Sequence, residues 1–114
     1  MGTAASIPPP HPNDVDRKRI ERALSKRLRY RYVSPEVSAV ENGYQIRSPC
    51  CSRNIDKSGG MIDIARIEYV AARRIWCLYR KEFSHDQWLL YAEFKSLPEL
   101  LQQLNQDTER IFWQ

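Results

Sequence analysis

The densest concentration of charge in the sequence is a cationic segment at residues 17–31. This segment has eight Lys or Arg residues and one Glu, a net charge of +7, whereas the whole 114-residue chain has a net charge of +4. At 100° per residue, five cations fall opposite the apolar Ile20, Leu24 and Leu28. These candidate anion-binding residues are Lys18, Arg19, Arg22, Lys26 and Arg29. Such a ridge favours phosphate or another polyanion, and the alternative is an ordinary solvated helix face.

The three cysteines are the next candidates for chemistry. Zinc ligands on one loop normally stand two or more residues apart, so the adjacent Cys50 and Cys51 do not form a typical zinc pattern with His11 and His85. Nearby arginines favour a reactive thiolate at Cys50 or Cys51 as a redox alternative. Cys77 lies in an apolar run, where a packed, inert side chain is expected. We therefore expect neither a metal nor a cofactor.

A third pattern consists of carboxylates with a nearby lysine. Asp63, followed later by Glu93-Phe94-Lys95, has the residue types of a metal-dependent nuclease, in which carboxylates hold Mg²⁺. The same acid-x-Lys pattern recurs at Asp16–Lys18, which indicates a chance match. The sequence contains no glycine-rich phosphate loop or zinc-protease motif, and His85 lies in a predicted turn where it is not positioned as a general base. We therefore expect no catalysis, and a metal-dependent nuclease or a cysteine-based redox enzyme remains a remote alternative.

These residues must be positioned by a small fold, because 114 residues are typical of one domain. Residues 1–12 contain four prolines and few apolar side chains, which predicts a disordered tail. The remainder, residues 13–114, is predicted to be a single α+β domain. Asn13 or Asp14 is expected to cap an amphipathic helix that ends at residues 30–33, because Pro35 disfavours the helical conformation of the residue before it.

After Pro35 the hydrophobic period changes to two, which predicts strands over residues 37–41, 44–48, 61–70, 75–80 and 87–94. Asn42-Gly43 is the expected pair of central residues in a type I′ hairpin turn. Ser96 is expected to cap a second helix with a buried stripe at Leu97, Leu100, Leu101 and Leu104. Together the elements predict an antiparallel four- to five-stranded meander sheet with an N-terminal and a C-terminal helix packed on one face.

Several motifs of the C-terminal half occur in a recognisable succession. Trp76-Cys77-Leu78-Tyr79 precedes the aromatic strand around Trp88, and the chain ends in Ile111-Phe112-Trp113 after Asp107. This succession resembles the bacterial domain-of-unknown-function family 3024, whose members carry a W-x-L-Y strand and end close to D-P-x-G-I-F-W-G. Thr108 and Arg110 replace the proline and the first glycine of that ending, and Gln114 replaces its final glycine. The resemblance implies a bacterial, cytoplasmic setting and assigns no functional residue.

The expected function follows from these patterns. No apolar run approaches the roughly 20 residues that span a bilayer, and the first ten residues lack the features of a signal peptide, so no membrane partner is expected. We expect a cytoplasmic, non-enzymatic binding module that weakly binds nucleic acid or another polyanion through residues 17–31. The alternative is a homodimer or another protein–protein interaction domain that uses an aromatic face of the sheet.

Overall fold

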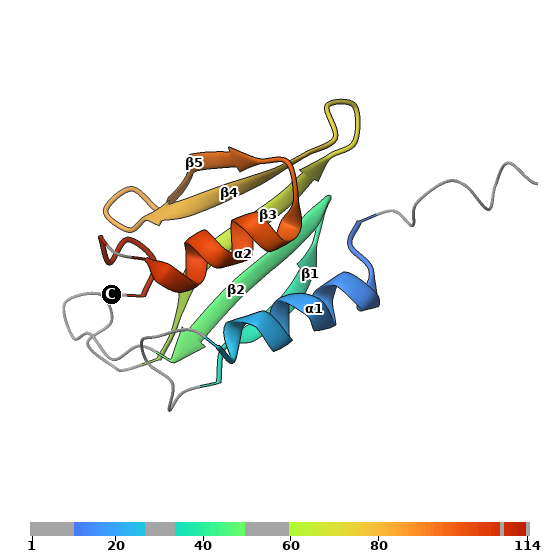
Figure 1. The fold of residues 1–114 in the computed structure, drawn as a ribbon. Coiled ribbons are helices and arrows are strands. Elements are labelled where there is room, and N and C mark those ends of the chain that lie inside the picture. Colours follow the sequence, from blue (N-terminus) through green and yellow to red (C-terminus); the bar gives the residue numbers. More distant parts are fainter. Residues whose placement is uncertain (1–10, 27–33, 50–59, 108, 114) are drawn as a thin grey trace, which may run out of the picture.

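The computed structural model describes residues 11–26, 34–49, 60–107 and 109–113. The elements follow the order α1 (Asp14–Leu24), β1 (Glu36–Val40), β2 (Gly43–Pro49), β3 (Met61–Val70), β4 (Ile75–Glu82), β5 (Gln87–Phe94) and α2 (Leu97–Gln106). The strands form one five-stranded antiparallel sheet in the order β1-β2-β3-β4-β5. Both helices lie on the same face of this sheet (Figure 1). The predicted α+β meander is therefore confirmed.

Helix α1 begins as its sequence predicts. The Asn13 side chain caps the helix by accepting the Asp16 N–H at 2.8 Å. The helix ends at Leu24, earlier than the predicted residues 30–33. Lys26 lies in the turn that follows, and residues 27–33, which include Arg29, lie outside the described residues.

The early end of α1 has a local and a distant cause. The Ser25 hydroxyl donates to the Arg22 carbonyl at 2.6 Å, and the Lys26 N–H donates to the Ala23 carbonyl at 3.0 Å. The same Ala23 carbonyl accepts the side-chain amide of Asn105, from α2, at 2.8 Å. These donors satisfy carbonyls that continuing helical turns would otherwise use. Because the helix is short, it contains four cations and three acids, a net charge of only +1.

The predicted hairpin forms between β1 and β2, but its turn lies one residue earlier than expected. Val40 pairs with Gly43, so Glu41 and Asn42 are the central residues, and Asn42 alone of these two has a positive φ, of 63°. Gly43 opens β2 instead. A Cβ at Gly43 would lie 1.9 Å from the Ile67 carbonyl oxygen of β3, so the glycine is required by the close approach of the two strands.

The hydrophobic core lies between the sheet and the two helices. Tyr44, Ile67 and Leu78, from three successive strands, are fully buried on the covered face, and α1 contributes Ile20 and Leu24. Helix α2 contributes the predicted buried stripe, which is confirmed: Leu97, Leu100, Leu101 and Leu104. The second face of the sheet carries no helix within the described residues.

The C-terminal segment is held by one buried carboxylate. Asp107 ends α2 in the left-handed conformation, and its side chain accepts the N–H groups of Ile111 at 2.8 Å, Phe112 at 3.1 Å and Trp113 at 2.7 Å. The Trp113 indole also donates to the Leu104 carbonyl at 3.1 Å. The spacing between the aspartate and the Ile-Phe-Trp ending therefore serves to close the core.

The domain also begins earlier than residue 13. His11 and Pro12, the last two residues of the expected disordered tail, are described, and the His11 side chain is largely buried. The rest of that expected tail, residues 1–10, lies outside the described residues. Four prolines led to the interpretation of residues 1–12 as a tail, but the aromatic partners of His11 come from strands 33 or more residues away.

Candidate anion-binding groove

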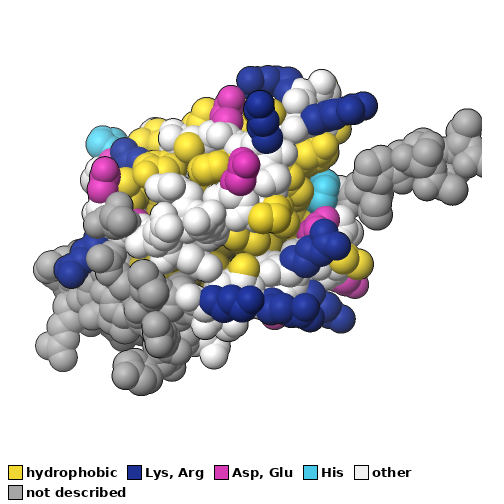
Figure 2. Space-filling model, viewed as in Figure 1, with side chains coloured by type: hydrophobic (Ala, Val, Ile, Leu, Met, Phe, Trp, Pro, Cys, Tyr) yellow, Lys and Arg dark blue, Asp and Glu magenta, His cyan; other side chains and the backbone are white. Residues whose placement is uncertain are grey.

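A groove of about 710 Å³ runs between α1 and α2. One side is formed by α1 and the turn after it, with Arg19, Arg22, Ala23 and Lys26. The other side is formed by α2, with Leu97, Pro98, Leu101, Gln102, Asn105 and Gln106. Figure 2 shows dark-blue cationic side chains along α1 and yellow hydrophobic side chains between the two helices. The groove thus combines a cationic rim with an apolar floor.

Packing against the sheet determines which side of α1 faces the groove. Ile20 and Leu24 are fully buried, so residues on the flanks of this stripe point sideways or outward. Asn105 then ties α2 to the end of α1 through its bond to the Ala23 carbonyl. The Asn105 Oδ1 atom is buried and has no hydrogen-bond partner among the described residues. The Asn105 amide therefore holds the two walls of the groove together, although its unsatisfied buried oxygen reduces the stability of the fold.

The structure places only some of the five predicted anion-binding residues in the groove. Arg19, Arg22 and Lys26 line the groove. Lys18 is exposed on α1 but is not a groove residue, and Arg29 lies outside the described residues. The sequence pattern identified exposed cations on α1 and could not separate those beside α2 from those turned away from it.

Ion pairs on α1 decide which cations remain available to a ligand. Arg17 pairs with Asp14 and Glu21, and Arg19 pairs with Asp16 at 3.3 Å. Within the described part of the chain, Arg22 and Lys26 form no ion pair. An anionic group at this rim would therefore meet two uncompensated cations beside a leucine floor.

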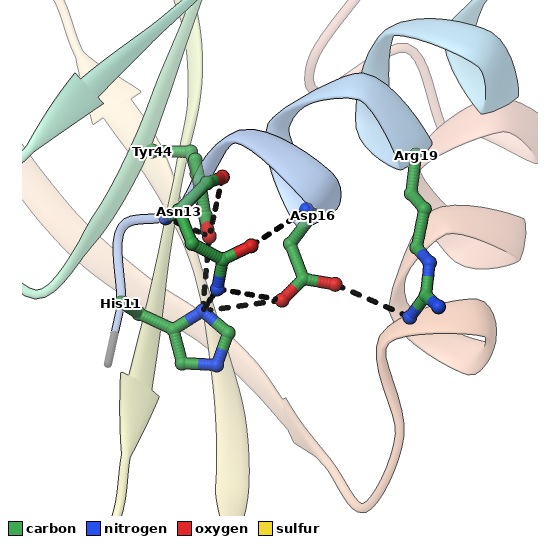
Figure 3. Close-up of polar contacts among 5 residues, drawn as sticks. All are labelled: His11, Asn13, Asp16, Arg19 and Tyr44. Carbon is green, nitrogen blue, oxygen red and sulfur yellow. Dashed lines mark hydrogen bonds and ion pairs between the residues drawn. The ribbon is translucent and has the colours of Figure 1, made fainter. Parts of the chain in front are cut away.

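A second polar cluster lies at the start of α1, where sequence reasoning expected a tail. His11 Nδ1 lies 2.9 Å from the Tyr44 hydroxyl and 3.5 Å from an Asp16 carboxylate oxygen, and Asp16 also reaches Arg19 (Figure 3). The His11 ring packs against Tyr69 and Trp76 at centroid distances of 4.9 and 4.7 Å. The available sequence signal was only the position of His11 just before the helix cap.

Burial sets the protonation of this cluster. Desolvation lowers the pKa of His11 below its ordinary value, and the neighbouring Asp16 carboxylate opposes this effect in part. Desolvation likewise raises the pKa of Tyr44. His11 is thus held neutral in a mainly aromatic environment. The cluster anchors the chain ahead of α1 to the sheet.

The nuclease pattern is not assembled by the fold. Asp63 accepts a hydrogen bond from Gln45 at 2.7 Å and pairs with Lys81 at 3.1 Å, whereas Glu93 pairs with Arg73 at 3.2 Å. Glu93 is level with Cys77 of β4 and with Glu68 of β3. Glu68 pairs with Gly43 and Asp63 pairs with Arg47, so the two levels are about 13 Å apart along the sheet at about 3.3 Å per residue. The two carboxylates therefore do not share a site. Across the described ranges, no group of three or more His, Cys, Asp or Glu side chains could hold a metal ion.

Of the three cysteines, the structure describes only Cys77. Cys50 and Cys51 lie outside the described residues. The Cys77 thiol is buried, and desolvation together with the nearby Glu93 and Glu68 carboxylates raises its pKa. A raised pKa disfavours the thiolate, so Cys77 is an inert, packed side chain as expected.

Comparison with protein families identifies the family of this chain. The family model described as Domain of unknown function (DUF3024) matches residues 8–114, and the chain belongs to this family. The matched region begins before His11, in agreement with the packing of that residue. Comparisons with curated proteins and with solved structures found no significant match. Among the described residues, no helix combines the length and hydrophobicity needed to cross a membrane.

Proposed function

We propose that this domain is a non-enzymatic binding module that takes an anionic partner in the groove between α1 and α2. The observation that supports this proposal is the pair Arg22 and Lys26, which line the groove without an ion-pair partner in the described part of the chain. Arg22 lies in the last turn of α1 and Lys26 in the turn after it, so two cations without an acidic partner repel each other there. A bound anion would remove that repulsion.

The number of available cations limits the affinity. Arg22 and Lys26 are unpaired in the described residues, and Arg19 is shared with Asp16. Two phosphate contacts imply that a fourfold rise in salt weakens binding to duplex DNA about tenfold, because each contact releases condensed counterions. Nucleic acid is one ligand of this kind, and the +7 charge of residues 17–31 supports it. Any binding is expected to be weak and strongly dependent on salt.

The test compares two charge reversals on the same helix. Arg22→Glu changes a groove residue and Lys18→Glu changes an exposed residue outside it, while both alter the net charge equally. Fluorescence anisotropy with labelled duplex DNA, single-stranded DNA and polyglutamate, at about 50 and about 200 mM salt, measures binding. We expect Arg22→Glu to weaken binding about tenfold and Lys18→Glu about twofold or less.

Two results would contradict the proposal. If none of the three anionic probes binds the wild-type protein at low salt, the domain is not an anion-binding module. If Lys18→Glu weakens binding as much as Arg22→Glu, the ligand responds to the overall charge of α1, and the groove is not its site.

Self-association is a second candidate function, favoured by one exposed side chain. Leu90 is 51 % exposed on the face of the sheet opposite the helices, where it pairs with Tyr79 of β4. Trp88 lies on the same face, against the Lys81 ammonium group at 4.9 Å from the ring centroid. An apolar residue beside two aromatic rings on an uncovered sheet face is a suitable contact for a second copy of the chain.

A further inference from the structure

The floor of the α1–α2 groove restricts the kind of anion that fits it. Ala23 and Pro98, together with the small exposed edges of Leu97 and Leu101, supply apolar surface, and none of the described residues that line the groove is aromatic. Single-stranded nucleic acid gains much of its affinity by stacking bases on aromatic side chains, which this floor does not provide. Duplex DNA presents its phosphates on a polar exterior that would leave a leucine floor unused. The floor therefore favours a ligand with an apolar surface of its own.

The rim of the groove is charged on one side only. Arg19, Arg22 and Lys26 line the α1 side, while Gln102 and Gln106 on α2 are uncharged and exposed. Arg19 and Arg22 lie about one turn apart on α1, and Lys26 follows four residues later, in the turn after the helix. Acidic side chains on one edge of a neighbouring helix recur with the same spacing.

A second copy of this chain does not offer that complement. The exposed residues of α2 include a single acid, Glu99, which is not a groove residue. Two copies joined through their grooves would bring Arg22 and Lys26 of one chain close to the same cations of the other. Like charges across an interface oppose association.

We infer that the groove binds an acidic amphipathic helix of a partner protein. In this arrangement an apolar stripe of the partner covers Pro98 and the exposed edges of Leu97 and Leu101, and its Asp or Glu residues lie beside Arg22 and Lys26. Such helix-in-groove recognition uses apolar anchors at i, i+3 or i+4 and i+7. The inference rests on the proposed anion-binding function and specifies the class of partner.

The experiment uses two synthetic helical peptides with the same composition. One has leucines at i, i+4, i+7 and i+11 flanked by glutamates, and the other has the same residues in a scrambled order without an apolar stripe. We expect the amphipathic peptide to bind at least about tenfold more tightly, because only it can cover the leucine floor while pairing its acids. Amide chemical-shift changes should concentrate at residues 19–26 and 97–106.

Substitutions on the uncharged side of the groove make the test independent of the folding of α1. Gln102 is exposed, and no hydrogen bond of its side chain is present among the described residues. Gln102→Lys should tighten binding of the acidic amphipathic peptide about threefold and Gln102→Glu should weaken it by a similar factor. Lys18→Glu is the control outside the groove and should change binding less than either.

The outcomes separate this inference from the proposed function. Equal binding of the two peptides would overturn the inference, because affinity would then depend on charge alone. Tighter binding of DNA than of the amphipathic peptide would also overturn it, while leaving the anion-binding function intact. Absence of binding by the peptides, DNA and polyglutamate together would reject both.

Discussion

At the residue scale, His11 is the side chain with the most unusual surroundings. Its ring contacts Tyr44, Tyr69 and Trp76, and its Nδ1 atom lies near the Tyr44 hydroxyl and the Asp16 carboxylate. The Asn13 backbone N–H donates to the same Tyr44 hydroxyl at 3.0 Å. A neutral imidazole can accept the hydroxyl hydrogen of Tyr44, whereas a protonated one would force that hydroxyl to reorient.

This environment predicts a pH-dependent stability. Burial lowers the pKa of His11 below its ordinary value of 6.5, so the unfolded chain binds the proton more readily than the folded chain. The stabilising contribution of neutral His11 is complete above pH 6.5 and is lost as the pH falls from 6.5 towards the folded-state pKa. We therefore expect the free energy of unfolding, measured with urea, to be lower at about pH 5.5 than at about pH 7.5.

Two substitutions identify the histidine responsible. His11→Gln, which does not titrate, should flatten this part of the pH profile. His85→Gln is the matched control, because His85 is exposed in the turn between β4 and β5 and should leave the profile unchanged. If His11→Gln retains the wild-type pH dependence, the buried imidazole is not its source.

At the scale of the elements, the approach of β2 to β3 is the tightest constraint. Gly43 pairs with Val40 on one side and Glu68 on the other, and its Cα hydrogens face the Ile67 carbonyl. We expect Gly43→Ala to destabilise the domain by about 3 kcal/mol, because the added methyl group must push backbone atoms apart. Denaturant unfolding measures the change.

The adjacent turn residue provides the control for this prediction. Asn42 has φ of 63°, a conformation that glycine adopts without strain, so Asn42→Gly should alter the free energy of unfolding by less than about 0.5 kcal/mol. If Gly43→Ala is equally harmless, the two strands can separate at little cost and the close approach does not constrain the sequence.

At the scale of the whole molecule, the two faces of the sheet differ. One is covered by α1 and α2 (Figure 1). The other carries the exposed Leu90 and the cross-strand ion pairs that join Asp63 to Arg47 and to Lys81. If a second copy docks on this open face, Leu90→Lys should shift the protein towards the monomer, because a charge would be buried at the contact. Sedimentation velocity over a range of concentrations measures the shift.

A matched control exists on the other side of the molecule. Val15 on α1 is 61 % exposed, so Val15→Lys makes a similar change far from the open face and should leave the association state unchanged. A wild-type protein that stays monomeric at the highest concentration would reject self-association. An equal effect of Leu90→Lys and Val15→Lys on the association state would also reject self-association through the open face.

Features of the fold that depend on sequence neighbours could be predicted. Asn13 and Ser96 cap their helices because a short polar side chain reaches N–H groups three residues ahead. The leucines of α2 recur at the helical period and are all buried. Short turns join β1 to β2, β3 to β4 and β4 to β5, so each of these pairs is adjacent in the sheet as it is in the sequence.

Other features depend on residues that meet only after folding. The Asn105 side chain, 82 residues from Ala23, helps to end α1 at Leu24, and the Ile67 carbonyl determines that residue 43 must be glycine. The composition of residues 1–12 resembles a tail, yet His11 finds its aromatic partners on β2, β3 and β4.

The candidate site likewise has one part that the sequence predicted and one part that only the folded structure revealed. Helical periodicity was sufficient to place Lys18, Arg19, Arg22 and Lys26 outside the core, because that assignment requires only the positions of the apolar residues along α1. Only the packing of α2 beside α1 separated Arg22 and Lys26 from Lys18 and supplied the leucine floor. A groove is a relation between two helices that lie more than 70 residues apart in the chain, and no local pattern in either helix encodes it.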